Sequence, residues 1–141
     1  MLAKWMHRDR PAGPVYFTDV YYSYGGGMSG GNTSGHLYLK NSSWVYDYSS
    51  KPTWNSKETK KVYHPGEEII KQLEEIIRKY GLVEASKKPQ SDLIALDADT
   101  ASLSVTLEDG TSFRLYDFQD LDEHESEGYR EFLKVLREIV K

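Results

Sequence analysis

A glycine-rich segment, Gly25-Gly26-Gly27-Met28-Ser29-Gly30-Gly31-Asn32, is the part of the chain most suggestive of ligand binding. Ordering closely spaced glycines costs conformational entropy, so such a segment serves an unusual turn, close approach of a ligand, or mobility. A phosphate-binding loop needs a lysine after the glycines and a helix behind them, whereas this segment leads into strand-like residues without a lysine. Residues 27–31 match the Gly-x-Ser-x-Gly elbow in letters, but that elbow also requires a following helix. The segment therefore favours a long hairpin connection or a recognition loop over a catalytic one.

As a recognition loop, the segment would act together with polar and aromatic side chains of its flanking strands. We expect contacts to a protein, peptide or carbohydrate partner from five residues around it: Tyr22, Tyr24, Met28, Asn32 and His36.

Two aspartates, Asp97 and Asp99, follow the apolar run Leu93-Ile94-Ala95-Leu96. Paired carboxylates after a strand could serve a phosphatase or a metal site, but Thr100 is too close for the phosphatase motif. An Asp-x-Asp pair is by itself a weak metal signature. The alternative is a turn in which Asp side chains bind backbone amides. These aspartates keep open a second function, a small hydrolase or transferase with its site between them and the glycine-rich segment.

An acidic segment from Asp117 to Glu127 could supply oxygen ligands to Ca²⁺, but its spacing is not that of an EF-hand. Acidic residues ahead of a helix also favour its positive end, and Asp122 with Glu125 would form a capping box if the final helix starts early. The four histidines form no metal-binding pair in sequence. We expect no metal, no cofactor and no catalytic residue, and regard a non-enzymatic role as the better hypothesis.

Composition narrows the class of protein further. The chain of 141 residues has no cysteine and a net charge of −4. Up to His64 it carries eight Lys/Arg against four Asp/Glu, and from Pro65 ten against eighteen. A basic, aromatic first half is compatible with single-stranded nucleic acid, but the lysines are scattered and we regard this partner as disfavoured. No stretch is apolar enough to span a membrane or begin a signal peptide, so we expect a cytoplasmic protein, with export of a processed chain as the alternative.

Alternation of apolar and polar residues predicts strands at 15–24, 35–40, 44–48, 58–64, 101–108 and 111–118. Asn41-Ser42 and Asp109-Gly110 are typical of tight turns between strands. Helical spacing predicts a helix at 66–80 ended by Gly81, and a final helix from about Gly128 to Val140. Residues 82–90 are expected to be a connector.

The expected fold is α+β, with an antiparallel sheet of about five or six strands in the order β-β-β-β-α-β-β-α and two helices packed on one face. Residues 1–14 form a predicted N-terminal extension, and residues 15–141 a single domain. Two helices cover one face of a sheet, so the other face is expected to be open, with Tyr38, Trp44, Tyr46 and Tyr48 on it.

The Tyr-Ser-Tyr strand, the Gly-Gly-Met-x-Gly-Gly loop and the segment Ser91–Thr100 resemble an uncharacterised family of small bacterial α+β proteins of unknown function. The resemblance covers most of the chain from about Val20. It implies a shared fold in which the glycine-rich loop and the Leu-Asp-Ala-Asp segment belong together, and it implies no activity.

These observations lead to one hypothesis: a non-enzymatic binding module that uses a Tyr-rich open sheet face and the glycine-rich hairpin. Trp44 and Tyr46 join the expected binding residues because amphipathic rings on an exposed sheet suit protein, peptide or sugar contacts. A homodimer through the same face is the simpler form of the hypothesis.

Overall fold

The computed structural model describes residues 15–25, 30–89, 100–117 and 119–141. In these ranges the chain forms β1 (Phe17–Gly25), β2 (Asn32–Lys40), β3 (Ser43–Lys51), β4 (Thr59–Tyr63), α2 (Glu67–Lys79), α3 (Leu82–Ala85), β5 (Thr100–Leu107), β6 (Ser112–Tyr116) and α4 (Glu123–Ile139). The predicted extension at residues 1–14 lies outside the described residues, as do Met28, Asp97 and Asp99.

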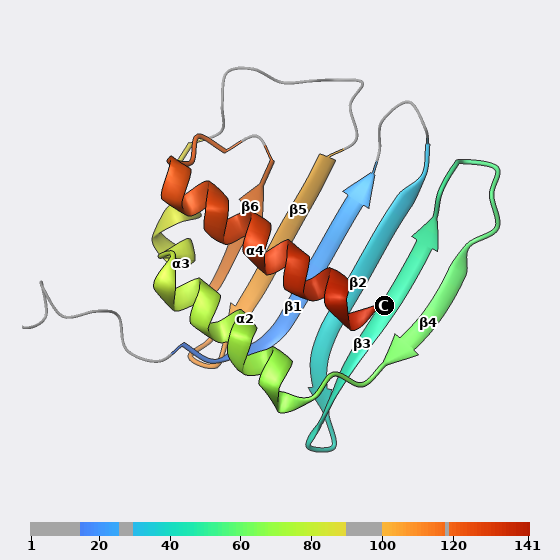
Figure 1. Ribbon diagram of the computed structural model, residues 1–141, viewed down its shortest axis with the longest axis horizontal. Coiled ribbons are helices and arrows are strands. Elements are labelled where there is room, and N and C mark those ends of the chain that lie inside the picture. The colour runs from blue at the N-terminus through green and yellow to red at the C-terminus, as the bar shows by residue number, and fades with distance from the viewer. Residues whose placement is uncertain (1–14, 26–29, 90–99, 118) are drawn as a thin grey trace, which may run out of the picture.

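The strands form one antiparallel sheet in the order β4-β3-β2-β1-β5-β6 (Figure 1). Strands β1 and β2 pair on either side of the glycine-rich segment, up to Gly25 opposite Asn32. Strand β1 also pairs with β5, where Tyr22 lies opposite Leu103. This second pairing joins the meander β1–β4 to the hairpin β5–β6 and makes β1 a central strand.

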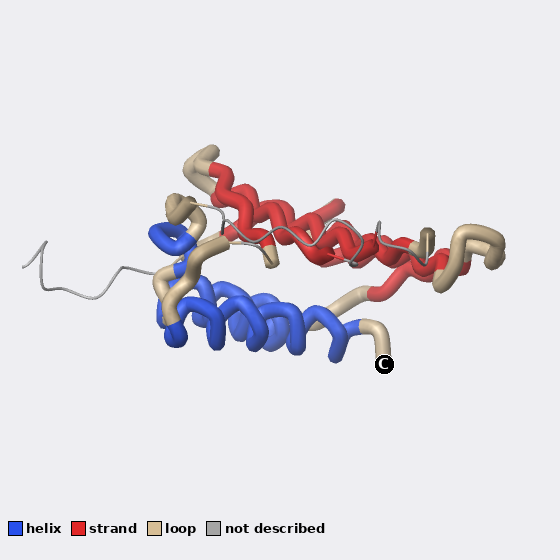
Figure 2. The backbone as a smooth tube through the Cα atoms, turned by 90° about the horizontal axis from the view of Figure 1, so that it is seen from above, coloured by secondary structure: helices blue, strands red, loops and turns tan. Residues whose placement is uncertain are grey.

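Helices α2 and α4 lie side by side on one face of the sheet (Figure 2). The α+β class and the order of long elements are therefore as predicted. The one-turn helix α3 occupies the start of the segment 82–90, which was expected to be a connector throughout. No helix in the described ranges is long and apolar enough to cross a membrane.

The apolar stripe of α2 packs toward the sheet, with Ile70, Leu73 and Ile77 buried. The helix ends where Gly81 adopts a left-handed φ of +61°, a conformation that glycine reaches without steric cost.

Helix α4 begins at Glu123, so the predicted start near Gly128 is wrong, and part of the acidic segment is helical rather than loop. The reason is the capping box: Asp122 accepts a hydrogen bond from the Glu125 backbone N–H, and the Glu125 side chain accepts one from the Asp122 N–H. This reciprocal pair satisfies two backbone donors and starts the helix ahead of its first large apolar residue, Tyr129.

The turn at Asn41-Ser42 sets which residues of β3 face the helices. Both turn residues have positive φ, 51° and 66°, as in the two-residue turns that match strand twist. Because the turn is so short, Leu37 of β2 lies opposite Tyr46 of β3. Paired residues share a face, so Tyr46 enters the core with Leu37.

The expected position of the aromatic residues on the open face is therefore wrong for most of them. Tyr46 is only 1% exposed, and Trp44 and Tyr48 pack against the same core. Tyr38 alone of this group lies on the open face, where its hydroxyl donates to Asp47 Oδ2 at 3.0 Å. The face that carries most of the rings is the face that the helices cover.

A register shift near the start of β1 brings two large side chains to the same face. Strict alternation along the strand would place Phe17 and Val20 on opposite faces, yet both are buried, at 2% and 0% exposure. The shift falls between Phe17 and Asp19 in the pairing with β5. An irregularity of this kind adds a residue to one strand and rotates the following side chains to the other face.

Candidate functional site

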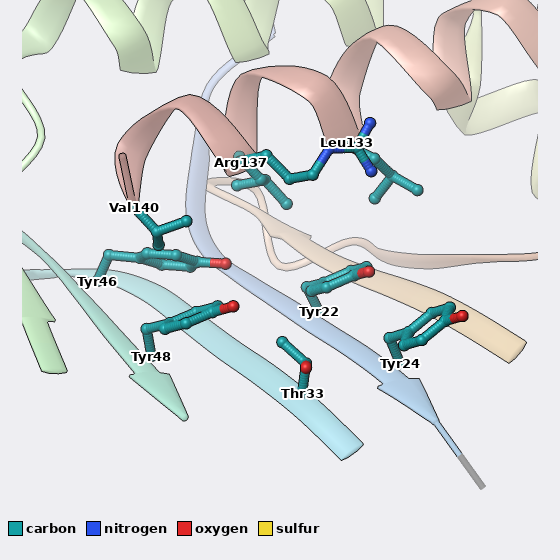
Figure 3. A pocket seen from close by; sticks show the side chains of 9 residues that line it. Tyr22, Tyr24, Thr33, Tyr46, Tyr48, Leu133, Arg137 and Val140 are labelled. Carbon is teal, nitrogen blue, oxygen red and sulfur yellow. The ribbon is translucent and has the colours of Figure 1, made fainter. Parts of the chain in front are cut away.

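A cleft opens between the C-terminal half of α4 and the strands β1, β2 and β3 (Figure 3). Its volume is about 350 Å³. We call it the tyrosine cleft, and its lining residues are Tyr22, Tyr24, Thr33, Tyr46, Tyr48, Leu133, Leu136, Arg137 and Val140. The tyrosines and Thr33 form its floor, and the residues of α4 with Val140 form its roof.

The floor is hollow because Gly35 has no side chain. This glycine is buried in β2, opposite Tyr22 on one side and Tyr48 on the other. The Tyr46 ring lies over it, so closely that a Cβ at position 35 would be 2.0 Å from the Tyr46 Oη. The glycine therefore lets three rings gather around one point of the sheet and leaves space between them and α4.

The tyrosine hydroxyl groups of the floor are free to bind a ligand, whereas the Thr33 hydroxyl lies 3.5 Å from Ser50 Oγ. Across the described ranges, Tyr22, Tyr24, Tyr46 and Tyr48 have no hydrogen-bond partner for their side chains, although every fully buried polar side-chain atom there has one. Tyr46 is the most telling, because its side chain is almost wholly buried and its hydroxyl points into the cleft (Figure 3). The hydroxyl is not itself a fully buried atom, so a molecule in the cleft can reach it.

Burial also fixes the protonation of two of these phenols, Tyr46 and Tyr22, by raising the pKa of each. Desolvation raises the pKa of Tyr46 well above its usual value, and the neighbouring Tyr48 and Tyr22 add to the effect. Desolvation likewise raises the pKa of Tyr22, while the positive charge of Arg137 acts in the opposite direction. At neutral pH both groups are therefore neutral O–H donors that also accept hydrogen bonds, and neither is suited to act as a base.

Arg137 supplies the positive charge of the cleft. It is exposed on α4, and it takes part in none of the ion pairs found in the described part of the chain, although Glu138 beside it pairs with Lys141 at 3.4 Å. The cleft lining contains no Asp or Glu. The site thus combines one cation, five hydroxyl groups and three aliphatic side chains.

Three of the residues expected to bind a partner meet in this cleft: Tyr22, Tyr24 and Tyr46. The others do not join them. Asn32 is exposed at the start of β2, and Trp44 packs edge-on against Phe17 with ring centroids 5.4 Å apart. Met28 lies outside the described residues.

His36, the remaining candidate, lies on the open face of the sheet. Its Nε2 is 3.0 Å from Asp19 Oδ1, and its ring stands 4.6 Å from that of Tyr38. An aspartate and a histidine make two members of a hydrolytic triad, but no serine hydroxyl is bonded to this histidine in the described ranges. The pair is half exposed, so its hydrogen bond contributes little to stability.

The expected site between the glycine-rich segment and Asp97 and Asp99 falls on residues that the structure does not describe. Elsewhere, within residues 15–25, 30–89, 100–117 and 119–141, no group of three or more His, Asp or Glu could hold a metal ion.

Sequence reasoning missed six of the nine lining residues: Thr33, Tyr48, Leu133, Leu136, Arg137 and Val140. One sequence pattern could have identified the residues of the helix: Leu133, Leu136, Arg137 and Val140 follow the i, i+3, i+4, i+7 spacing of one helix face. The cation interrupts an otherwise apolar stripe, and such an interruption on a core-facing helix marks a place where the core opens.

No family model matches the chain, and no curated protein matches it.

Proposed function

We propose that this protein is a non-enzymatic binding module that takes the flat, apolar part of a small organic molecule into the tyrosine cleft. The observation that carries the proposal is the Tyr46 hydroxyl, which points into the cleft from an almost wholly buried side chain and bonds to no group in the described ranges. The hydroxyl itself is not fully buried, so a molecule in the cleft can reach it. A phenol hydroxyl can both donate a hydrogen bond to such a molecule and accept one from it.

The shape and lining of the cleft support the same proposal. A volume of about 350 Å³ lies within the range of small-molecule sites, which are concave and mostly apolar with a few polar groups. The Tyr46 and Tyr48 rings, 6.1 Å apart and inclined by 34°, offer their faces and edges to a flat ligand. Neutral phenols recognise hydrogen-bonding groups, which favours binding over catalysis.

The position of the cleft connects it with the glycine-rich hairpin. Tyr24 and Thr33 form one of the last pairs between β1 and β2, and Gly25 and Asn32 follow directly. The cleft floor therefore lies next to Gly25 and Asn32, the first and last residues of the glycine-rich segment, which supports a joint role for the rings and this segment.

The test is a screen of small aromatic fragments, followed by the amide signals of the labelled protein in NMR spectra. We expect binding fragments to shift the signals of Tyr22, Thr33 and Arg137 in the natural protein. Thr33→Trp fills the cleft and should abolish these shifts. Ser34→Trp places the same ring on the opposite face of the same strand, and should leave them intact.

Circular dichroism and thermal unfolding must first show that both tryptophan variants are folded. Fragments that bind Thr33→Trp as well as they bind Ser34→Trp would contradict the proposal. So would a screen at millimolar concentration in which no fragment shifts any signal of the cleft.

A further inference from the structure

We infer that the ligand of the tyrosine cleft is an anion, a carboxylate or phosphate carried on an apolar body, and that Arg137 holds its charged group. This inference rests on the proposed function and deepens it. The proposal of the preceding section concerns the body of the ligand, whereas this inference concerns its charged end.

The first support is that Arg137 is the one cation lining the cleft and forms no ion pair with the described residues. Other described cations, Arg130 among them, also lack an ion pair, but they do not line the cleft. On α2 the Arg78 guanidinium binds Glu75, and ahead of α4 the Lys88 ammonium lies 2.8 Å from Glu125 Oε1. Arg137 has no comparable carboxylate in the described part of the chain. A guanidinium is a planar fork of donors that matches the two oxygens of a carboxylate or phosphate.

The second support is that the cleft contains no negative charge to repel an anion and offers tyrosine hydroxyl groups as further hydrogen-bond donors. Its lining has no acidic side chain. Figure 3 shows the Arg137 side chain reaching from α4 across the roof, above Tyr22. Tyr22 and Arg137 line the same cleft, and the positive charge of Arg137 acts to lower the pKa of the Tyr22 hydroxyl.

Two local charges bear on this inference. Asp117 acts on Tyr22 with the opposite sign to Arg137, but it does not line the cleft. The C-terminal end of α4 is negative, which favours a cation in the last turn of the helix. That effect explains an arginine in the last turn, but it does not explain an arginine directed over unpartnered hydroxyl groups.

The experiment compares two pairs of probes: 2-naphthoate with 2-naphthamide, which has nearly the same shape without the charge, and phenyl phosphate with phenol, which lacks the charged group. Dissociation constants come from NMR titration of the Tyr22, Thr33 and Arg137 signals. We expect each anion to bind roughly tenfold or more tightly than its neutral partner, the difference that a charge-assisted hydrogen bond supplies. Arg137→Gln should bring the ratio close to one.

Arg130→Gln is the matched control. It removes the same charge from the same helix, seven residues earlier, at a residue that does not line the cleft. The preference for the anion should persist in this variant. Loss of the preference in both variants would show a general effect of net charge and would overturn the inference.

The outcomes separate the inference from the proposed function. If 2-naphthamide binds the cleft as tightly as 2-naphthoate, the inference fails and the proposed function stands. If inorganic phosphate alone binds at Arg137 as tightly as phenyl phosphate, the anion site stands and the proposed role of the apolar body fails. If no probe shifts a cleft signal, both fail.

Discussion

The two faces of the sheet use the same kinds of residue in opposite ways. On the open face, a row of serines crosses four neighbouring strands, Ser49, Ser34, Ser23 and Ser102, and polar side chains pair with one another, as in Asp19 with His36 and Tyr38 with Asp47. On the covered face, apolar side chains fill the core, but at one end four tyrosine hydroxyls remain without partners in the described ranges. The unused hydrogen-bonding capacity thus lies beneath a helix.

This contrast shows that aromatic content alone does not identify a binding surface. Tyr38 and Tyr46 are eight positions apart on adjacent strands, and both are tyrosines. The first bonds to a surface aspartate, while the second is buried over a glycine. The register of β2 and β3 decides which role each takes.

The largest expected difference between the faces is in stability. Leu37→Ala removes a side chain with 0% exposure from the covered face, and should lower the free energy of unfolding by about 3 kcal/mol. Tyr38→Ala, the next residue, removes an exposed hydrogen bond and should lower it by less than about 1 kcal/mol. Urea unfolding measures both. Equal losses would mean that the open face is covered in solution.

A smaller effect is expected from filling the hollow of the cleft floor. In Gly35→Ala the added Cβ meets the Tyr46 ring, with Cζ at 2.3 Å as well as Oη at 2.0 Å. Overpacking of this kind costs about 1–3 kcal/mol. Urea unfolding of the variant should show a loss in this range.

A double-mutant cycle ties that loss to Tyr46. In a Tyr46→Ala background the collision is absent, so Gly35→Ala should be neutral or slightly stabilising, because glycine in a strand is about 0.5–1 kcal/mol worse than alanine. A loss that persists in this background would show that position 35 excludes a side chain for another reason.

The third and smallest expected effect is a loss of stability at high pH that comes from the buried tyrosines. Burial raises the pKa of Tyr46 and of Tyr129 above the ordinary value of 10.0, and the charge and hydrogen bond of Asp117 raise the pKa of Tyr129 further. Above that pH the unfolded chain loses these protons while the folded protein keeps them. The stability is therefore fully present below pH 10 and falls as pH rises, by up to about 1.4 kcal/mol per pH unit for each tyrosine.

Urea unfolding at several pH values above about 10 measures this slope. Tyr46→Phe should reduce this slope by the contribution of one tyrosine, and it removes no hydrogen bond to the protein. Tyr129→Phe should reduce it equally but also lower stability at neutral pH, because the Tyr129 hydroxyl bonds to Asp117 Oδ1 at 3.1 Å. A slope unchanged by Tyr46→Phe would contradict the description of this phenol as buried.

Local patterns in the sequence were enough to predict the class of fold. Period-two alternation located each strand to within a few residues, and the apolar stripe with Gly81 located α2. The predicted start of α4 was wrong because an apolar stripe marks only the part of a helix that packs against the core. The exposed first turn depends instead on the capping box of Asp122 and Glu125.

The sequence could also have predicted which side chains of β2 and β3 face the helices, but through more steps of inference. A two-residue turn at Asn41-Ser42 pairs Lys40 with Ser43, and counting back from that pair places Tyr46 opposite Leu37. The cleft itself was not within reach. Tyr22, Tyr24 and Tyr46 could be chosen for their side chains, but Arg137 belongs to the site only because α4 docks over β1–β3, and no local pattern encodes that docking.

The place of α4 in the chain has a consequence for how the protein is assembled. The floor of the cleft comes from β1, β2 and β3, whereas its roof comes from α4, which follows all other described elements. During synthesis the floor strands can pair early through their short connections, and the cleft is completed only when α4 docks. A molecule bound there would join the early strands to the late helix, so that its binding energy would favour the last step of folding.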